Sequence, residues 1–174
     1  MAIKRAHVAV LAVPLSAALG IAGHEAMRTE AYIPVPGDVP TICVGNTRYL
    51  DGRPVTLGDR AEPLDCLALF ARTLDQFEGG VKQCVQVPLA PHEYQAFVSF
   101  AYNVGAGAFC KSTLVRKLNT GDYDGACGEL LRWRFFQGFD CSTPGNRKCA
   151  GLWHRRQSEY AQCMGATNVA SAGS

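Results

Sequence analysis

Apolar and polar positions change their spacing several times along this chain, and the first change marks a leader. Residues 6–23 (AHVAVLAVPLSAALGIAG) contain no Asp, Glu, Lys or Arg, and Lys4 and Arg5 precede them. A cationic start before an apolar stretch is typical of a secretory signal, and this one nearly reaches the roughly 17–25 residues that span a bilayer. Because the stretch is rich in alanine and glycine and contains Pro14, we expect it to insert weakly and to be able to leave the membrane.

The stretch after the leader predicts a turn and a small β region. Residues 25–32 can continue as the end of a helix, and the proline- and glycine-rich residues 34–37 end it and turn the chain. Residues 41–44 have high β propensity, and Gly45 and Gly52 punctuate a hairpin region. We therefore expect one small β-hairpin lobe near the N-terminus.

From about Ala61 the apolar residues recur at spacings of three and four, which predicts amphipathic helices. The Gly79-Gly80 pair is expected to end the first helix, and Pro91 to begin the next, since proline costs no hydrogen bond in a first helical turn. The expected apolar positions are Leu67, Phe70, Leu74 and Phe77 in the first helix and Tyr94, Phe97, Val98 and Ala101 in the second.

Three further helices are predicted toward the C-terminus. Ser112 can cap residues 113–119 (TLVRKLN), and Asp122 can cap residues 123–133 (YDGACGELLRW). Residues 151–163 (GLWHRRQSEYAQC) read as the last helix. The chain is thus predicted to be a mostly helical α+β protein.

The bulk composition excludes some classes of partner. The chain has 174 residues, which suits one domain with up to two lobes, and a formal net charge of +2. The charge is too small to favour nucleic acid, and the basic residues form no run longer than two. No metal or organic cofactor is expected, because the sequence has neither a ligand cluster with zinc spacing nor a glycine-rich phosphate loop.

Eight cysteines are many for a chain of this length. They form no CxxC pair, and an even number spread over the folded part indicates disulfides and hence an oxidising compartment. Eight cysteines allow 105 pairings, and the favoured local bridge is Cys141 to Cys149. The candidates are Cys43, Cys66, Cys84, Cys110, Cys127, Cys141, Cys149 and Cys163.

Five blocks of the sequence follow a recognisable order. They are HEAMRTEAY, PTICVGNT, VPLAPHEYQAFVSFAYNVGAGAFCKSTLVRKLNTGDYDGAC, ELLRW and GLWHRRQSEYAQC. In this order they resemble the phage lysozymes, or endolysins, of glycoside hydrolase family 24, the group of the T-even phage lysozyme. The resemblance covers roughly Glu25 to Gly165. It implies a mostly helical α+β lysozyme-like fold with a small β-hairpin lobe and a larger helical lobe.

The resemblance also implies an activity, the cleavage of peptidoglycan between N-acetylmuramic acid and N-acetylglucosamine. Carried over by position, Glu25 is the general acid, a role that requires a carboxyl group whose pKa is raised by burial. In an inverting mechanism a second group holds the attacking water, and Thr41 lies in the matching strand. Arg156, or its neighbour Arg155, matches a basic residue that can approach the acid from the last helix. Two surface arginines are the alternative.

The second carboxylate departs from the family pattern. Where the family has Asp, nine residues after Glu25, this chain has Pro34, which cannot act as a base. The only acid in the turn is Asp38, which we expect to replace it; the competing interpretation is that Asp38 is a solvated turn residue. In that case Thr41 and water complete the site, or a substrate group attacks internally. The internal attack would give a 1,6-anhydro sugar and make the enzyme a lytic transglycosylase.

The leader resembles the signal-arrest-release segments of some phage endolysins. We expect residues 1–24 to form this segment, residues 25–165 the catalytic domain, and residues 166–174 a flexible tail. Residues 6–23 would hold a monomeric enzyme transiently at the inner membrane, facing the periplasm, until release. No cysteine precedes Cys43, which argues against thiol exchange in the leader itself. A cleaved signal peptide, or a protein that binds peptidoglycan without cutting it, are the alternatives.

Overall fold

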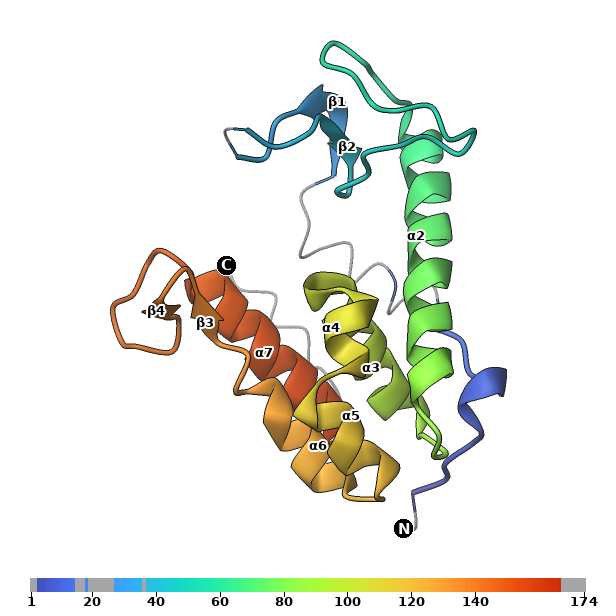
Figure 1. Cartoon of the computed structure of the whole chain (residues 1–174), viewed down its shortest axis with the longest axis vertical. Coiled ribbons are helices and arrows are strands. Elements are labelled where there is room, and N and C mark those ends of the chain that lie inside the picture. The colour runs from blue at the N-terminus through green and yellow to red at the C-terminus, as the bar shows by residue number, and fades with distance from the viewer. Residues whose placement is uncertain (1–2, 15–17, 19–26, 36, 167–174) are drawn as a thin grey trace. The chain divides into compact units, whose positions relative to one another are not determined.

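The computed structural model describes residues 3–14, 18, 27–35 and 37–166. It confirms the predicted class, because the described residues are mostly helical with two small antiparallel sheets (Figure 1). The chain forms two compact units. We call Pro14–Gln76 the β unit, and Met1–Val13 together with Phe77–Ser174 the helical unit.

The β unit contains the first sheet. Strand β1 (Arg28–Tyr32) pairs antiparallel with β2 (Thr41–Cys43). The expected helix end is therefore wrong for residues 28–32. The backbone of β1 also bonds on to the segment before the long helix, where the Ala61 N–H donates to the Thr29 carbonyl at 2.9 Å. Pairing with two separate segments outweighs the weak helical signal of this short stretch.

The core of the β unit lies where β2 meets the start of helix α2 (Pro63–Cys84). It contains Ile42, Cys43, Val55, Ala61, Cys66 and Leu69. The two glycines expected to punctuate a hairpin region do so, since Gly45 and Gly52 have φ of 92° and 86°, conformations that favour glycine.

Helix α2 continues through Gly79-Gly80 to Cys84, so the predicted end at the glycine pair is wrong. A side chain at Gly80 would place its Cβ 2.6 Å from that of Ala106. The glycine thus allows α2 to approach α4 (Ala106–Cys110) closely rather than ending the helix. The predicted apolar face is also partly wrong, because Leu67 is exposed while Cys66 and Leu69 are buried.

The other predicted helices are confirmed. They are α3 (Pro91–Val104), α5 (Thr113–Asn119), α6 (Tyr123–Leu130) and α7 (Ala150–Cys163), with α3 packed on α7 and α5 on α6. Ser112 Oγ accepts the Val115 N–H at 3.2 Å, and Asp122 Oδ1 accepts the Gly125 N–H at 3.0 Å, as expected of caps. Helix α6 ends three residues before Trp133, and a second, unpredicted hairpin follows it: β3 (Phe135–Phe136) and β4 (Phe139–Asp140).

All eight cysteines form disulfides, and the predicted Cys141–Cys149 bridge is among them. The other pairs are Cys43–Cys66, Cys84–Cys110 and Cys127–Cys163. The Cys84–Cys110 bridge joins α2 to α4, and Cys127–Cys163 joins α6 to α7. Four cross-links of this kind restrict the unfolded chain and are typical of secreted domains.

The described beginning of the leader is folded against the helical unit. The backbones of Ala6 and Leu89 exchange two hydrogen bonds of 2.8 Å, and Val8, in the short helix η1 (Val8–Val10), is buried. Within the described part of the chain, no helix combines the length and the apolar character needed to cross a bilayer.

Candidate active site

The predicted catalytic residues belong to the β unit. Glu25, the predicted acid, lies outside the residues that the structure describes. Asp38 is exposed and follows Gly37, whose φ is 89°. Its N–H donates to the Val35 carbonyl at 3.0 Å, and its Oδ1 accepts the Val39 N–H at 2.8 Å. The Asp38 carboxylate is therefore partly used to stabilise the turn, and it is open to water.

Thr41 begins strand β2 and is buried, with only 4 % of its surface exposed. Its Oγ1 donates to the Val39 carbonyl at 3.1 Å. The side chains of Asp38 and Thr41 thus bind the two backbone groups of one residue, Val39. A hydroxyl that donates its proton in this way keeps lone pairs that can accept a hydrogen bond from water.

The predicted supporting arginines belong to the helical unit. Arg155 and Arg156 both lie in α7 and are buried, so the alternative of two surface arginines is wrong. Arg156 has no exposed surface, and burial lowers its pKa. Its Nη2 donates to Asn103 Oδ1, and its guanidinium lies 4.7 Å from the centre of the Phe100 ring.

Glu159, one turn further along α7, completes this buried cluster. Its Oε2 lies 3.2 Å from Arg156 Nη1, close enough for an ion pair but without hydrogen-bond alignment, and its Oε1 accepts the Ser99 hydroxyl at 2.9 Å. Burial raises the pKa of Glu159 to about 7, and the positive charge of Arg156 limits the rise. Arg156 Nε and Nη1 have no hydrogen-bond partner among the described residues. The guanidinium can therefore bind a further acceptor.

Sequence reasoning missed Glu159, Ser99 and Asn103. The one available signal was the spacing of Arg156 and Glu159, three residues apart on a helix, which allows an ion pair on one face. Ser99 and Asn103 come from α3, and only the packing of α3 on α7 brings them to this cluster.

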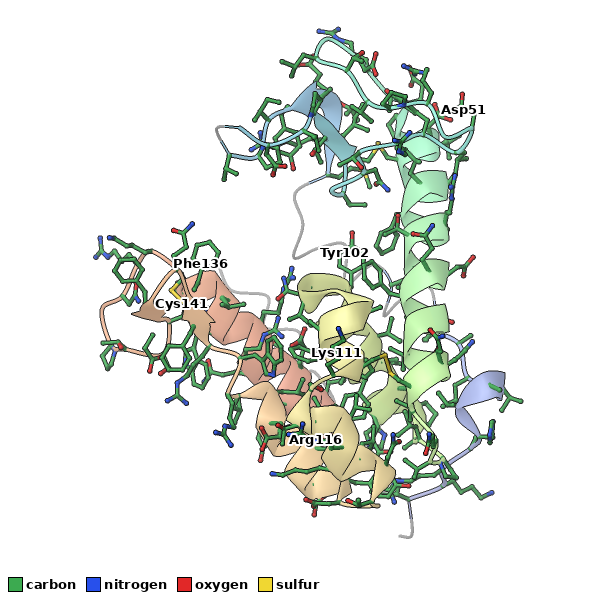
Figure 2. The ribbon with its side chains drawn as sticks, viewed as in Figure 1. Asp51, Tyr102, Lys111, Arg116, Phe136 and Cys141 are labelled. Atoms are coloured by element: carbon green, nitrogen blue, oxygen red, sulfur yellow. A yellow bond between two sulfur atoms is a disulfide. The ribbon has the colours of Figure 1, made fainter. Side chains whose placement is uncertain are left out.

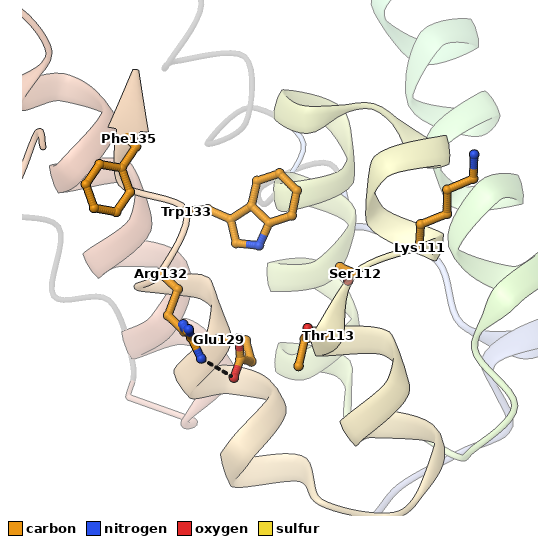
Figure 3. Close-up of a pocket in the computed structure, with 7 residues that line it drawn as sticks. All are labelled: Lys111, Ser112, Thr113, Glu129, Arg132, Trp133 and Phe135. Atoms are coloured by element: carbon orange, nitrogen blue, oxygen red, sulfur yellow. Dashed lines mark ion pairs between the residues drawn. The ribbon is translucent and has the colours of Figure 1, made fainter. Parts of the chain in front are cut away.

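Two hollows lie apart from the predicted residues. One, of roughly 420 Å³, belongs to the helical unit (Figure 3). There Glu129 is held by Lys117 at 2.8 Å and by Arg132 at 3.5 Å. The second, of roughly 380 Å³, belongs to the β unit and is lined by Tyr49, Asp51, Arg53 and Arg60, among others. The hollow of the helical unit is lined by Lys111, Ser112, Thr113, Glu129, Arg132, Trp133 and Phe135. Neither hollow is lined by Asp38, Thr41 or Arg156.

Among the residues that the structure describes, no three His, Cys, Asp or Glu side chains are grouped so that they could hold a metal ion.

Known proteins are similar to this chain over most of its length. The SAR-endolysin of Escherichia phage Mu is 34% identical over 168 residues, which cover 91% of this chain and 90% of the relative. The SAR-endolysin of Pseudomonas phage phiKMV is 34% identical over 152 residues, covering 86% and 88%. A crystal structure of a P22 lysozyme mutant superposes with a TM-score of 0.74 at 29% identity, over 89% of this chain and 99% of that one. The family model described as phage lysozyme matches residues 22–159, and the chain therefore belongs to the phage lysozyme family.

Proposed function

We propose that this chain is an exported endolysin that hydrolyses the β-1,4 bond between N-acetylmuramic acid and N-acetylglucosamine in bacterial peptidoglycan, and so lyses a phage-infected host. The observation that carries the proposal is the family match over residues 22–159, which includes Glu25, Asp38 and Thr41. The substrate class follows from membership of the lysozyme family. The enzyme acts as a monomer.

In the proposed mechanism Glu25 protonates the glycosidic oxygen, and a water attacks the other face of the sugar. Asp38 is the base for this water, and Thr41 orients it. The exposure of Asp38 and the free lone pairs of the Thr41 oxygen support these roles. Because both side chains are bonded to Val39, the turn that follows Pro34 can present them together.

Arg156 is proposed as a positioning residue for Glu25. It is a buried cation whose Nε and Nη1 lack hydrogen-bond partners among the described residues, and such a group stabilises an additional carboxylate. Its ion pair with Glu159 and its contact with Asn103 fix the guanidinium in place.

We further propose that the leader is retained in the active enzyme. Arg5 binds the Glu93 carboxylate through contacts of 2.6 and 3.1 Å and lies 3.6 Å from the centre of the Tyr123 ring. The Val13 N–H donates to Glu78 Oε1 at 2.7 Å. A peptidase that removed the leader would delete these contacts and leave the buried Glu93 without its cation.

The same segment cannot lie in a bilayer and against the helical unit at once. We propose that residues 6–23 first tether the exported chain to the inner membrane and then leave it, after which residues 3–13 pack as described. The relatives from phages Mu and phiKMV are SAR-endolysins, which supports this order of events.

The test of the activity is mass spectrometry of purified peptidoglycan digested by the oxidised wild-type chain and by Glu25→Gln. Reducing muramic acid ends that disappear in Glu25→Gln, but persist in the exposed control Glu62→Gln, are the expected result. Anhydromuramic ends would instead identify a lytic transglycosylase. No cleavage by correctly oxidised wild-type protein would favour the binding alternative and overturn the proposal.

Asp38→Asn tests the base. We expect at least a hundredfold loss of turnover, on the order of general-base catalysis, with unchanged thermal unfolding. Asp51→Asn is the matched control, because Asp51 is also an exposed turn residue of the β unit and accepts the Arg53 N–H at 2.9 Å. Turnover of Asp38→Asn equal to that of Asp51→Asn would show that Asp38 only stabilises its turn.

A further inference from the structure

The hairpin formed by β3 and β4 exposes three phenylalanines within five residues. Phe135, Phe136 and Phe139 have 61%, 51% and 42% of their surfaces exposed. Phe136 pairs with Phe139 across the hairpin, and the two residues between them, Gln137 and Gly138, have positive φ of 48° and 82°. Two positive φ values are what a tight two-residue hairpin turn requires. The aromatic rings are therefore presented at the tip of a defined structure.

The base of this hairpin is held rigidly, so the exposure of the rings is not the result of a loose loop. The Cys141–Cys149 disulfide closes the segment that follows β4 (Figure 2 labels Cys141 and Phe136). Arg134 Nε lies 3.1 Å from Asp140 Oδ2, and the Asp140 backbone carbonyl accepts a hydrogen bond from the Asn146 side-chain amide at 3.0 Å. Polar bonds and a covalent cross-link thus fix the base while the apolar side chains face outward.

Positively charged side chains lie beside two of the three rings. Residues 132–148 contain four cations and one carboxylate, a net charge of +3, whereas the whole chain carries +2. Lys148 Nζ lies 4.2 Å from the centre of the Phe139 ring, and the Arg134 guanidinium lies 5.3 Å from that of Phe135. The cations are Arg147, Lys148, Arg134, which pairs with the one carboxylate, Asp140, and Arg132, which pairs with Glu129 just before this segment.

We propose that this aromatic hairpin, residues 132–149, is a docking surface for an anionic phospholipid bilayer. Exposed rings at the tip suit the boundary between acyl chains and headgroups, and cations beside them suit the phosphates. Phenylalanine carries no polar group that could bond sugar hydroxyls, so three such rings fit lipid better than a glycan strand. The hairpin would keep the body of the enzyme at the membrane surface next to the proposed tether.

The proposal uses the export that we propose for this chain but none of its catalytic residues. Vesicle binding and peptidoglycan cleavage can therefore fail independently of each other.

The test is co-sedimentation of the full-length, oxidised protein with vesicles of phosphatidylcholine alone and of equal parts phosphatidylcholine and phosphatidylglycerol. The variant replaces Phe135, Phe136 and Phe139 by Ser; being exposed, these positions tolerate the change, and circular dichroism checks the fold. The matched control replaces three exposed leucines of the β unit, Leu50, Leu57 and Leu64, by Ser. Both proteins keep the leader, so any binding through residues 6–23 is common to them.

We expect the phenylalanine variant to bind anionic vesicles roughly tenfold or more weakly than wild type, and the leucine control to change by less than about twofold. Arg147→Gln with Lys148→Gln should remove the preference for phosphatidylglycerol. Equal losses in the two triple variants would overturn the proposal. So would a phenylalanine variant that binds vesicles like wild type but no longer sediments with insoluble peptidoglycan, which would assign the hairpin to the glycan.

Discussion

Two buried glutamates of the helical unit are paired with arginines in different ways. At the start of α3, the Glu93 carboxylate forms an ion pair with Arg5 of the leader and also accepts a hydrogen bond from the Ala90 N–H at 2.7 Å. In the α3–α7 cluster, Glu159 Oε2 lies 3.2 Å from Arg156 Nη1 of its own helix, and groups on both side chains have no hydrogen-bond partner within the described part of the chain.

The difference separates an ion pair that serves stability from one whose arginine can still bind a further acceptor. The first pair is complete, and it exists only when the leader is folded on the body. The second costs desolvation of a full charge, and part of its guanidinium has no hydrogen-bond partner among the residues that the structure describes, which is unfavourable for stability alone. We infer that the Arg5–Glu93 pair couples folding to the leader, whereas the Arg156–Glu159 pair holds a cation ready for a further carboxylate.

The largest stability effect is expected for Arg156→Met above pH 7, where Glu159 is ionised. Removing one partner of a buried ion pair leaves this carboxylate without its cation, which should cost about 3–5 kcal/mol of unfolding free energy. Denaturant unfolding measures it. The double variant Arg156→Met with Glu159→Gln should recover more than half of this loss and yet stay poorly active. Full activity in the double variant would exclude a role of Arg156 at the site.

Arg5→Ala is expected to cost about 2–3 kcal/mol, because the buried Glu93 carboxylate loses its charged partner. Lys4→Ala is the matched control, an exposed cation beside it in the leader, and should change the unfolding free energy by less than about 0.5 kcal/mol. If the two variants unfold alike, the leader is not part of the folded enzyme.

The buried Glu159 should make stability depend on pH. The pKa of Glu159 is raised to about 7 in the folded state, so the native protein holds this proton above pH 4.5 while the unfolded chain releases it. The contribution of Glu159 to the free energy of unfolding is fully present below pH 4.5. It is lost as the pH rises through 7, and the total loss is roughly 2–3 kcal/mol. Glu159→Gln should remove this slope. An unchanged slope would show that other groups cause it.

The smallest effect concerns the ring under Arg5. Tyr123→Leu removes the cation–π contact and the hydrogen bond from the Tyr123 hydroxyl to the Pro88 carbonyl, together about 1–2 kcal/mol. Tyr123→Phe removes only the hydrogen bond. In the chain that keeps Arg5, we expect Tyr123→Leu to lose more unfolding free energy than Tyr123→Phe. If this difference disappears when both changes are made in the Arg5→Ala chain, it is due to the arginine.

The sequence predicted those parts of the fold that depend on local chemistry. The caps Ser112 and Asp122, the helix start at Pro91 and the short Cys141–Cys149 bridge all follow from neighbours in the chain. The predicted helix end at Gly80 is wrong because the role of this glycine, a close approach to Ala106, depends on tertiary packing. The sequence alone does not distinguish a glycine within a helix from one that ends it.

The site was predictable only in part, and for a related reason. The roles of Glu25 and Thr41 rest on the family motif, and that of Asp38 on its being the only acid in a turn that departs from the motif. All three stay predictions, and the structure adds how Asp38 and Thr41 are bonded to Val39. The cluster around Arg156 needs residues from two helices far apart in sequence, so the family resemblance pointed to the arginine but not to Ser99 or Asn103.

We propose above all that the leader becomes part of the active enzyme. The most direct test is the intact mass of the soluble, peptidoglycan-cleaving protein recovered from the periplasm of an expressing cell. We expect a chain that retains Arg5 and Val13, with all eight cysteines oxidised. A fully active protein that begins after the leader would contradict it, because Glu93 would then be buried without its cation at no cost to folding.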